Sequence, residues 1–140
     1  MPDRRLPSSL TWLAALVMLA LVTAIVAGIA IYVETQAASH VQANMMTHGN
    51  ADSGRTAIVA NGCQSCHVIP GISGPAGRVG PDLTHVAQRA TIAGKFVNDP
   101  ETMVRWLMHP QRMSPGSGMP EQGLSEKDAR NIAAFLYARR

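Results

Sequence analysis

An apolar run over residues 10–33 constrains this chain more than any other feature of its sequence. The run, LTWLAALVMLALVTAIVAGIAIYV, holds 24 residues and no charged side chain. As an α-helix it would be roughly 36 Å long, enough to cross a hydrocarbon layer about 30 Å thick with some tilt. A secretory signal peptide has a shorter apolar core of about 7–15 residues, and Ala24, Ala27 and Ala37 offer only imperfect cleavage sites. We therefore expect a retained transmembrane helix over residues 10–34.

Charges on either side of the run predict the orientation of the chain. Arg4 and Arg5 precede the run and Glu34 follows it, and positively charged residues stay on the cytoplasmic side of a membrane. Residues 1–9 are therefore expected in the cytoplasm and residues 35–140 on the periplasmic side of a bacterial inner membrane. The exported part carries ten Lys and Arg against seven Asp and Glu. It has no basic block that would predict nucleic-acid binding.

The part beyond the apolar run divides into a linker and a small domain. The polar segment 35–52 has no hydrophobic period and predicts a flexible linker, which leaves residues 53–140 for the domain. Three helices are expected in this domain, over residues 53–61, over residues 100–108 and at the carboxyl end. The loops between them are long and rich in Gly and Pro, and large apolar side chains are few. A large apolar cofactor would supply the missing core of such an all-α domain.

Local residues predict how these helices begin and how two of them pack. Asn98 or Asp99 can cap the second helix, and Ser125 resembles the first residue of a capping box at the third. Phe135 is expected to pack the third helix on the first near Gly62, where a small residue permits close approach.

The chain has only two cysteines, and both stand in the stretch CQSCH, directly before His67. A disulfide between residues this close stabilises little, because the entropic gain grows with loop length. A redox dithiol is typical of a strand-to-helix junction in a βαβ pattern, which the sequence does not show. A structural zinc site needs four ligands, and no second ligand pair is present. Covalent haem attachment explains all three residues, because Cys63 and Cys66 can each form a thioether with a porphyrin vinyl group while His67 binds the iron.

The second axial ligand of such an iron separates an electron carrier from a gas binder or a catalyst. We expect this ligand to be Met119, which lies in the Gly- and Pro-rich loop PGSGMPEQG. A thioether is a soft, neutral ligand that favours reduced iron. Met113, six residues earlier, is the main competitor. Four histidines are further alternatives: His40, His48, His85 and His109.

Four motifs occur in order along the domain: NGCQSCH, GPDLTHVAQR, GMPEQGLS and NIAAFLY. Together they resemble the class I mono-haem cytochromes c over residues 53–140. The likeness is closest to the cytochrome domain fused to subunit II of some bacterial haem–copper oxidases. It implies one haem c with thioether bonds at Cys63 and Cys66 and with His67 and Met119 as axial ligands.

The resemblance also implies partners around the haem. The backbone carbonyl of Pro81 would accept a hydrogen bond from the second ring nitrogen of His67. The indole N–H of Trp106 either reaches a haem propionate or the ring only packs against the haem, and both interpretations stay open.

Two features depart from the resembling oxidase domain. HPQ at residues 109–111 stands where that domain has DPQ, and a lone anchor precedes the cytochrome part in place of a copper-binding domain. The second departure leaves open whether the chain is an oxidase subunit or a separate tethered donor.

The sequence thus predicts a small all-α cytochrome c fold around one haem c, behind a single transmembrane helix. The expected function is to carry single electrons in a respiratory chain, from a quinol-oxidising complex to a terminal oxidase in the same membrane, without catalysis by the chain itself. The alternative is a haem-based sensor or ligand binder, which requires a labile sixth ligand. A catalytic haem enzyme is not favoured, because no distal acid–base pair is recognisable and the small domain leaves little room for a substrate pocket.

Overall fold

The computed structural model describes residues 8–74, 77 and 79–139 of the chain. Residues 1–7, which belong to the expected cytoplasmic segment and carry Arg4 and Arg5, lie outside the described residues. The chain divides into two compact units, Met1–Gln36 and Ala37–Arg140. We call the second unit the head.

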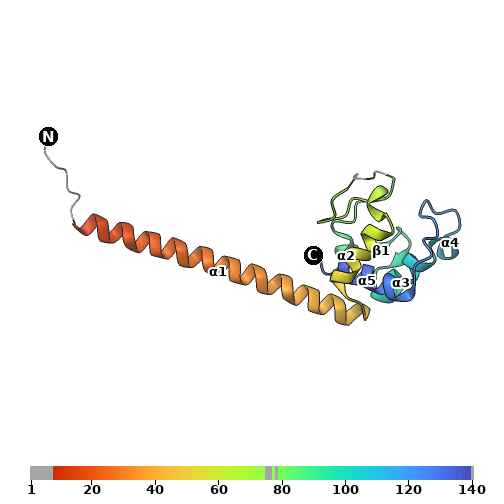
Figure 1. The fold of residues 1–140 in the computed structure, drawn as a ribbon, viewed down its shortest axis with the longest axis horizontal. Helices are drawn as coiled ribbons and strands as arrows, with labels where there is room; N and C mark the ends of the chain where they lie inside the picture. The colour runs from red at the N-terminus through yellow and green to blue at the C-terminus, as the bar shows by residue number, and fades with distance from the viewer. Residues whose placement is uncertain (1–7, 75–76, 78, 140) are drawn as a thin grey trace. The chain divides into compact units, whose positions relative to one another are not determined.

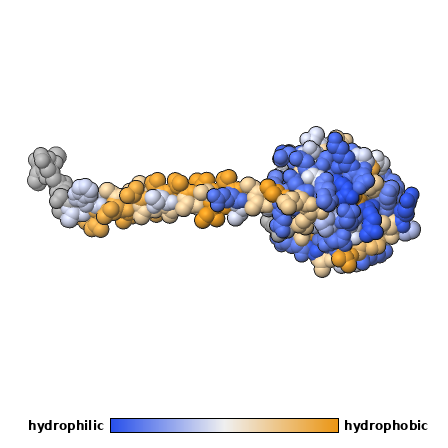
Figure 2. Space-filling model, turned by 90° about the horizontal axis from the view of Figure 1, so that it is seen from below, coloured by the Kyte–Doolittle hydropathy of each residue, from blue (hydrophilic) through white to orange (hydrophobic). Residues whose placement is uncertain are grey.

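The first unit consists mainly of the part of helix α1 (Ser8–Thr47) that runs up to Gln36 (Figure 1). Between Leu10 and Val33 its large apolar side chains are all at least 50% exposed, and Figure 2 shows its surface as mostly hydrophobic. Apolar surface on this scale is unfavourable in water. In the part of the chain that the structure describes, α1 is the one helix long and apolar enough to cross a membrane.

The structure differs from the flexible linker expected over residues 35–52. Residues 35–47 are helical, because α1 continues to Thr47. No Gly or Pro occurs between Glu34 and Thr47, and Ala, Gln and Met favour helix. The sequence showed no hydrophobic period because only two small side chains of this stretch, Ala43 and Thr47, are buried.

Three main helices form the rest of the head, as the sequence predicts: α2 (Ala51–Ala60), α3 (Pro100–Met108) and α5 (Glu126–Tyr137). The side chains of Asp99 and Ser125 cap α3 and α5. Helix α2 begins two residues earlier than expected, because Asn50 caps it by accepting a hydrogen bond from the backbone N–H of Ser53. Asn98, the alternative cap of α3, instead donates to two carbonyls of a neighbouring loop. The all-α fold class is confirmed.

Five shorter elements connect these helices: η1 (Cys63–Ser65), η2 (Val86–Gln88), β1 (Thr91–Ile92), β2 (Phe96–Val97) and α4 (Pro110–Met113). The strands pair antiparallel, with Thr91 opposite Val97 and Ile92 opposite Phe96. Strands of two residues are too short to show an alternating pattern, which is why the sequence indicated none.

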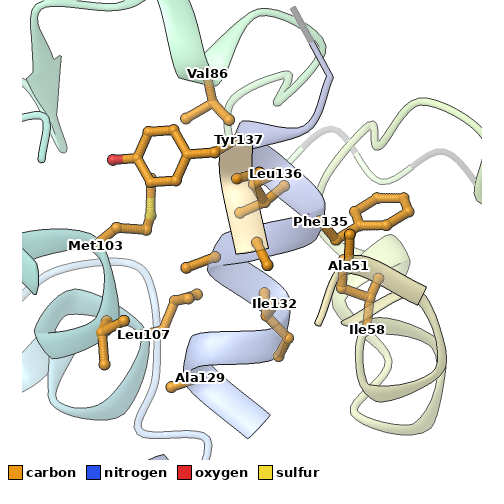
Figure 3. Close-up of a cluster of buried hydrophobic side chains, with 14 of the residues drawn as sticks. Ala51, Ile58, Val86, Met103, Leu107, Ala129, Ile132, Phe135, Leu136 and Tyr137 are labelled. Carbon is orange, nitrogen blue, oxygen red and sulfur yellow. The ribbon is translucent and has the colours of Figure 1, made fainter. Parts of the chain in front are cut away.

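The core of the head lies where α5 packs between α2 and α3 (Figure 3). On one side Phe135 lies against Ala51 and Ile58 of α2, and on the other Tyr137 lies against Met103 of α3. All five side chains are buried. Helix α5 therefore joins α2 and α3 into one packed unit.

Helices α2 and α5 meet backbone to backbone at Gly54. A Cβ at this position would lie 2.0 Å from the carbonyl oxygen of Asn131 and 2.9 Å from Cβ of Phe135. The crossing expected near Gly62 was wrong in position, because nothing lies within 4 Å of a Cβ there, and its φ of 65° instead lets the chain leave α2. The buried face of α2 has helical spacing and consists of Ala51, Gly54, Ala57 and Ile58.

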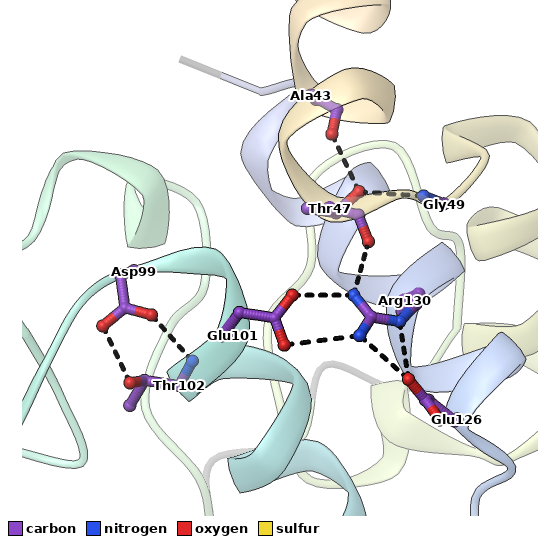
Figure 4. A network of polar contacts seen from close by, with 8 residues as sticks. All are labelled: Ala43, Thr47, Gly49, Asp99, Glu101, Thr102, Glu126 and Arg130. Carbon is purple, nitrogen blue, oxygen red and sulfur yellow. Dashed lines mark hydrogen bonds and ion pairs between the residues drawn. The ribbon is translucent and has the colours of Figure 1, made fainter.

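Arg130 of α5 joins three segments of the head (Figure 4). Its guanidinium donates to both carboxylate oxygens of Glu101 on α3, at 2.9 and 3.3 Å, and to Glu126 at 2.9 Å. The Arg130 guanidinium holds the pKa of the Glu101 carboxyl below its usual value. It also donates to the backbone carbonyl of Thr47 at 3.1 Å, and so provides a partner for one of the last carbonyls of α1, which have none within the helix.

Replacing Gly54 by alanine is expected to destabilise the head. The added methyl group would overlap the carbonyl of Asn131, and forcing the helices apart should cost about 1–3 kcal/mol. This loss should appear although alanine favours a helix by up to about 1 kcal/mol over glycine. Denaturant unfolding followed by circular dichroism measures it, with Ser53→Ala on the exposed side of α2 as the control. A Gly54→Ala protein as stable as the wild type would contradict the close crossing.

Candidate cofactor site

The head contains a cavity of about 470 Å³ with a largely apolar wall. Pockets that enclose small molecules and cofactors are roughly 300–1,000 Å³ in size. Buried side chains from three helices form much of the wall, among them Ile58, Leu107 and Ile132. All six predicted site residues line this one cavity: Cys63, Cys66, His67, Pro81, Trp106 and Met119.

The short turn η1 follows α2; Cys63 is its first residue and Cys66 caps its end. Cys63 accepts backbone hydrogen bonds from Cys66 at 3.2 Å and from His67 at 3.0 Å. Residues three apart eclipse one another on a 3₁₀ turn, so this turn brings both thiols to the same side. The cysteines are not joined in a disulfide.

The surroundings of the cysteines do not favour a zinc site or a redox dithiol. Burial raises the pKa of the Cys63 thiol, which disfavours the thiolate that metal binding and disulfide exchange require. Among the described residues, no three His, Cys, Asp or Glu side chains gather where they could hold a metal ion. Two thiols at the wall of an apolar cavity suit a covalent cofactor better.

The imidazole of His67 is oriented by a backbone carbonyl. Its Nδ1 lies 2.8 Å from the oxygen of Pro81, and a carbonyl only accepts, so Nδ1 carries the proton. The lone pair is then left on Nε2, the form in which a histidine ligates a metal. This hydrogen bond is the one expected from the sequence, while its role beside an iron remains a prediction.

Gly80 leaves the space that the imidazole of His67 occupies, and no sequence pattern indicated this role. A Cβ on Gly80 would lie 2.3 Å from Cε1 and 2.5 Å from Nδ1 of His67. The Gly80 backbone is itself fixed, because its N–H donates to the carbonyl of Cys66 at 2.8 Å. A glycine beside Pro81 resembles an ordinary turn in the sequence, and only the packing shows that the ring occupies the space of its missing side chain.

The candidate axial ligands differ from one another in whether they line the cavity. Met119 is half-buried and lines the cavity, whereas Met113 is absent from the described lining. Met103 also lines the cavity but is buried in α3 beside Tyr137. The four alternative histidines do not line it either: His40, His48, His85 and His109.

Two further side chains complete the rim and wall. Trp106 is 9% exposed and packs on Phe96, with ring centroids 5.9 Å apart. Arg89 also lines the cavity, and its exposed guanidinium donates to the backbone carbonyl of Asp82. The rest of the wall is mainly apolar, and its further polar residues include Asn61, Thr91, Ser117 and Gln122.

These residues fit a haem. The thiols of Cys63 and Cys66 can form two thioether bonds, and His67 and Met119 offer one nitrogen and one sulfur ligand. The largely apolar wall suits the faces of a porphyrin, and the exposed Arg89 in the lining could face its polar edge.

Comparisons with known proteins point the same way. The family model for cytochrome c matches residues 51–138. The chain is also similar to the cytochrome c oxidase subunit 2 of Alkalihalophilus pseudofirmus, with 33% identity over 87 residues. The similar stretch is 61% of this chain but only 25% of that relative, so the chain spans a quarter of its length. No solved structure matches the chain significantly.

Replacing Gly80 by alanine is expected to displace the imidazole of His67. The new Cβ would overlap the ring and break the hydrogen bond to Pro81, at a cost of about 1–3 kcal/mol in unfolding free energy. Gly118→Ala is the matched control, because nothing lies within 4 Å of a Cβ there. Denaturant unfolding of the two mature variants measures the difference. Equal stability of the two would contradict the packing of His67 on Gly80.

Proposed function

The chain belongs to the cytochrome c family, and from this premise we propose that it is a membrane-anchored electron carrier with one haem c. The head receives single electrons and passes them on within a respiratory chain. The chain itself catalyses no reaction. The observation that carries this proposal is the convergence of two thiols, one imidazole and one thioether on a single apolar cavity.

Each of the site residues has a distinct role in this proposal. Cys63 and Cys66 bind the haem through thioether bonds, and His67 and Met119 take the two axial positions. A bound haem supplies the one-electron Fe(II)/Fe(III) couple. With both positions held by the protein, small ligands are excluded and the site changes little between the two oxidation states.

The surroundings of the ligands support electron transfer over ligand binding. Pro81 keeps the proton on Nδ1 of His67, which strengthens Nε2 as a ligand. The thioether of Met119 favours the reduced iron. Trp106 is nearly buried in the wall of the cavity, and we propose that it packs against the haem and keeps water away.

The membrane partners follow from the anchor and the relative. Residues 10–34 are the proposed anchor, and they keep the cytochrome domain near proteins of the same membrane, which raises the effective concentration of each for the other. We propose a quinol-oxidising complex as the electron donor and a terminal oxidase as the acceptor. Similarity to a cytochrome c oxidase subunit 2 supports the acceptor. The positive residues Arg4 and Arg5 support a head on the periplasmic side of a bacterial inner membrane.

Removing the thioether of Met119 is expected to open the sixth position of the iron. The mature wild-type protein, when reduced, should show little change of its Soret band on addition of CO, whereas Met119→Ala should bind CO readily. Met113→Ala is the control and should behave as the wild type. Mass spectrometry checks first that each protein carries one covalent haem. A wild-type protein that binds CO at once would favour the alternative function, a ligand binder or sensor.

A terminal oxidase as acceptor gives a second expectation. The reduced full-length protein should be reoxidised by membranes that contain such an oxidase, and cyanide should stop this reoxidation because it blocks the oxidase. Membranes from a strain without the oxidase are the control. Reoxidation at the same rate with cyanide would exclude the oxidase as the acceptor.

A further inference from the structure

We propose that Gln111 is the positioning residue of the Met119 side of the site, and that it holds the loop 116–121 through both its side chain and its backbone. The proposal rests on the proposed function, since it concerns the iron only if Met119 is an axial ligand. Gln111 belongs to α4, outside the cavity wall, and therefore acts through the loop that bears Met119.

The carboxamide of Gln111 makes three hydrogen bonds to the backbone around Met119. Its Nε2 donates to the carbonyl of Ser117 and to the carbonyl of Met119 itself, both at 2.6 Å. Its Oε1 accepts from the backbone N–H of Gly116 at 3.2 Å. Both amide hydrogens and the amide oxygen are thus used on three residues of one loop, all within positions 116–119.

The backbone of Gln111 holds the other end of the loop. Its N–H donates to Oε1 of Glu121 at 3.0 Å. This N–H lies in the first turn of α4, where backbone N–H groups have no partner within the helix. Glu121 follows Met119 by two residues, so the loop is tied to Gln111 before, at and after the ligand.

The loop needs such a brace because of its composition. It contains Gly116 and Gly118, and Gly116 has a φ of 79°. Glycines lose much conformational freedom when they are fixed. Two further hydrogen bonds in this stretch are local: the backbone N–H of Ser117 donates to the carbonyl of Ser114 at 3.0 Å, and the hydroxyl of Ser117 accepts from the N–H of Met119 at 3.2 Å.

A glutamine is required for this arrangement, because the position needs two donors and one acceptor. An ionised glutamate of the same shape has no donor and would place an oxygen against the carbonyls of Ser117 and Met119. Gln122, the other glutamine of this region, makes one bond of 3.2 Å, to the carbonyl of Pro120. The identity of residue 111 should therefore control how firmly the Met119 sulfur is held.

The test compares Gln111→Glu and Gln111→Leu in the mature, full-length protein. Both remove the donors, and only the first adds a charge. We expect both to retain covalent haem and helix content, to bind CO in the reduced state about tenfold more readily than the wild type, and to have a lower reduction potential. The tenfold change corresponds to the loss of about one well-formed hydrogen bond. The lower potential would reflect a weaker bond between the Met119 sulfur and the iron.

Two controls separate positioning from general stability. Gln88→Glu introduces the same charge on an exposed side chain of η2 and should leave CO binding unchanged. Gly54→Ala loosens the packing of α2 on α5, far along the chain from the loop, and should lower stability without admitting CO. If Gly54→Ala admits CO as readily as the Gln111 variants, the opening reflects lost stability and the inference is overturned.

The remaining outcomes are distinguishable. A wild-type protein and Gln111 variants that exclude CO equally, at equal potential, overturn the inference and leave the proposed function intact. Increased CO binding in Gln111→Glu but not in Gln111→Leu also overturns the inference, because the added charge and not the lost donors would then be the cause. A wild-type protein that binds CO at once removes Met119 as the ligand, and the inference falls with it.

Discussion

The contact between α2 and α5 determines where everything else in the head can lie. At Gly54 the two backbones approach so closely that no side chain fits between them. Helix α5 in turn carries α3 on its other side, through Tyr137 and Met103. Because α2 ends at Ala60, the cysteine turn begins within a few residues of this fixed point. Side chains of the three helices, among them Ile58, Leu107 and Ile132, form one part of the cavity wall, and loop residues form the rest.

The two sides of the cavity are held by different means. On the His67 side, backbone hydrogen bonds join Gly80 to Cys66, and Leu83 to Val68. These bonds flank both His67 and its acceptor Pro81, and so hold the two segments together. On the Met119 side the amide of Gln111 bonds to the backbone of the loop that bears this proposed ligand. Of the two proposed ligands, His67 thus belongs to a backbone-bonded segment, and Met119 belongs to a loop whose backbone is bonded to one side chain. The stability of the second position is what separates an electron carrier from a ligand binder on the same fold.

The parts predictable from the sequence are those with local causes. Asp99 and Ser125 cap the helices that follow them, so α3 and α5 were found with their first residues. CQSCH needs no tertiary information either, because its spacing alone brings the thiols together. Gly54 was missed in favour of Gly62, since only the packed structure shows which glycine faces α5. Gln111 has partners that are all backbone groups or lie ten residues away, and no pattern of residue types reveals such contacts.

Most of the segment expected to be a flexible linker, residues 37–52, belongs to the head. Ala43 and Thr47 are buried, and the side chain of Asn44 accepts from the N–H of Ala51 at 2.8 Å. The backbone N–H of Asn50 donates to Asn131 of α5 at 2.8 Å, while Arg130 reaches the carbonyl of Thr47. A fragment that began at residue 53, where the resemblance to cytochromes begins, would leave these partners on α5 without the groups they bind. Packing therefore sets the amino-terminal limit of the head further upstream than the haem motifs do, and a fragment that preserves these contacts includes residues 43–52.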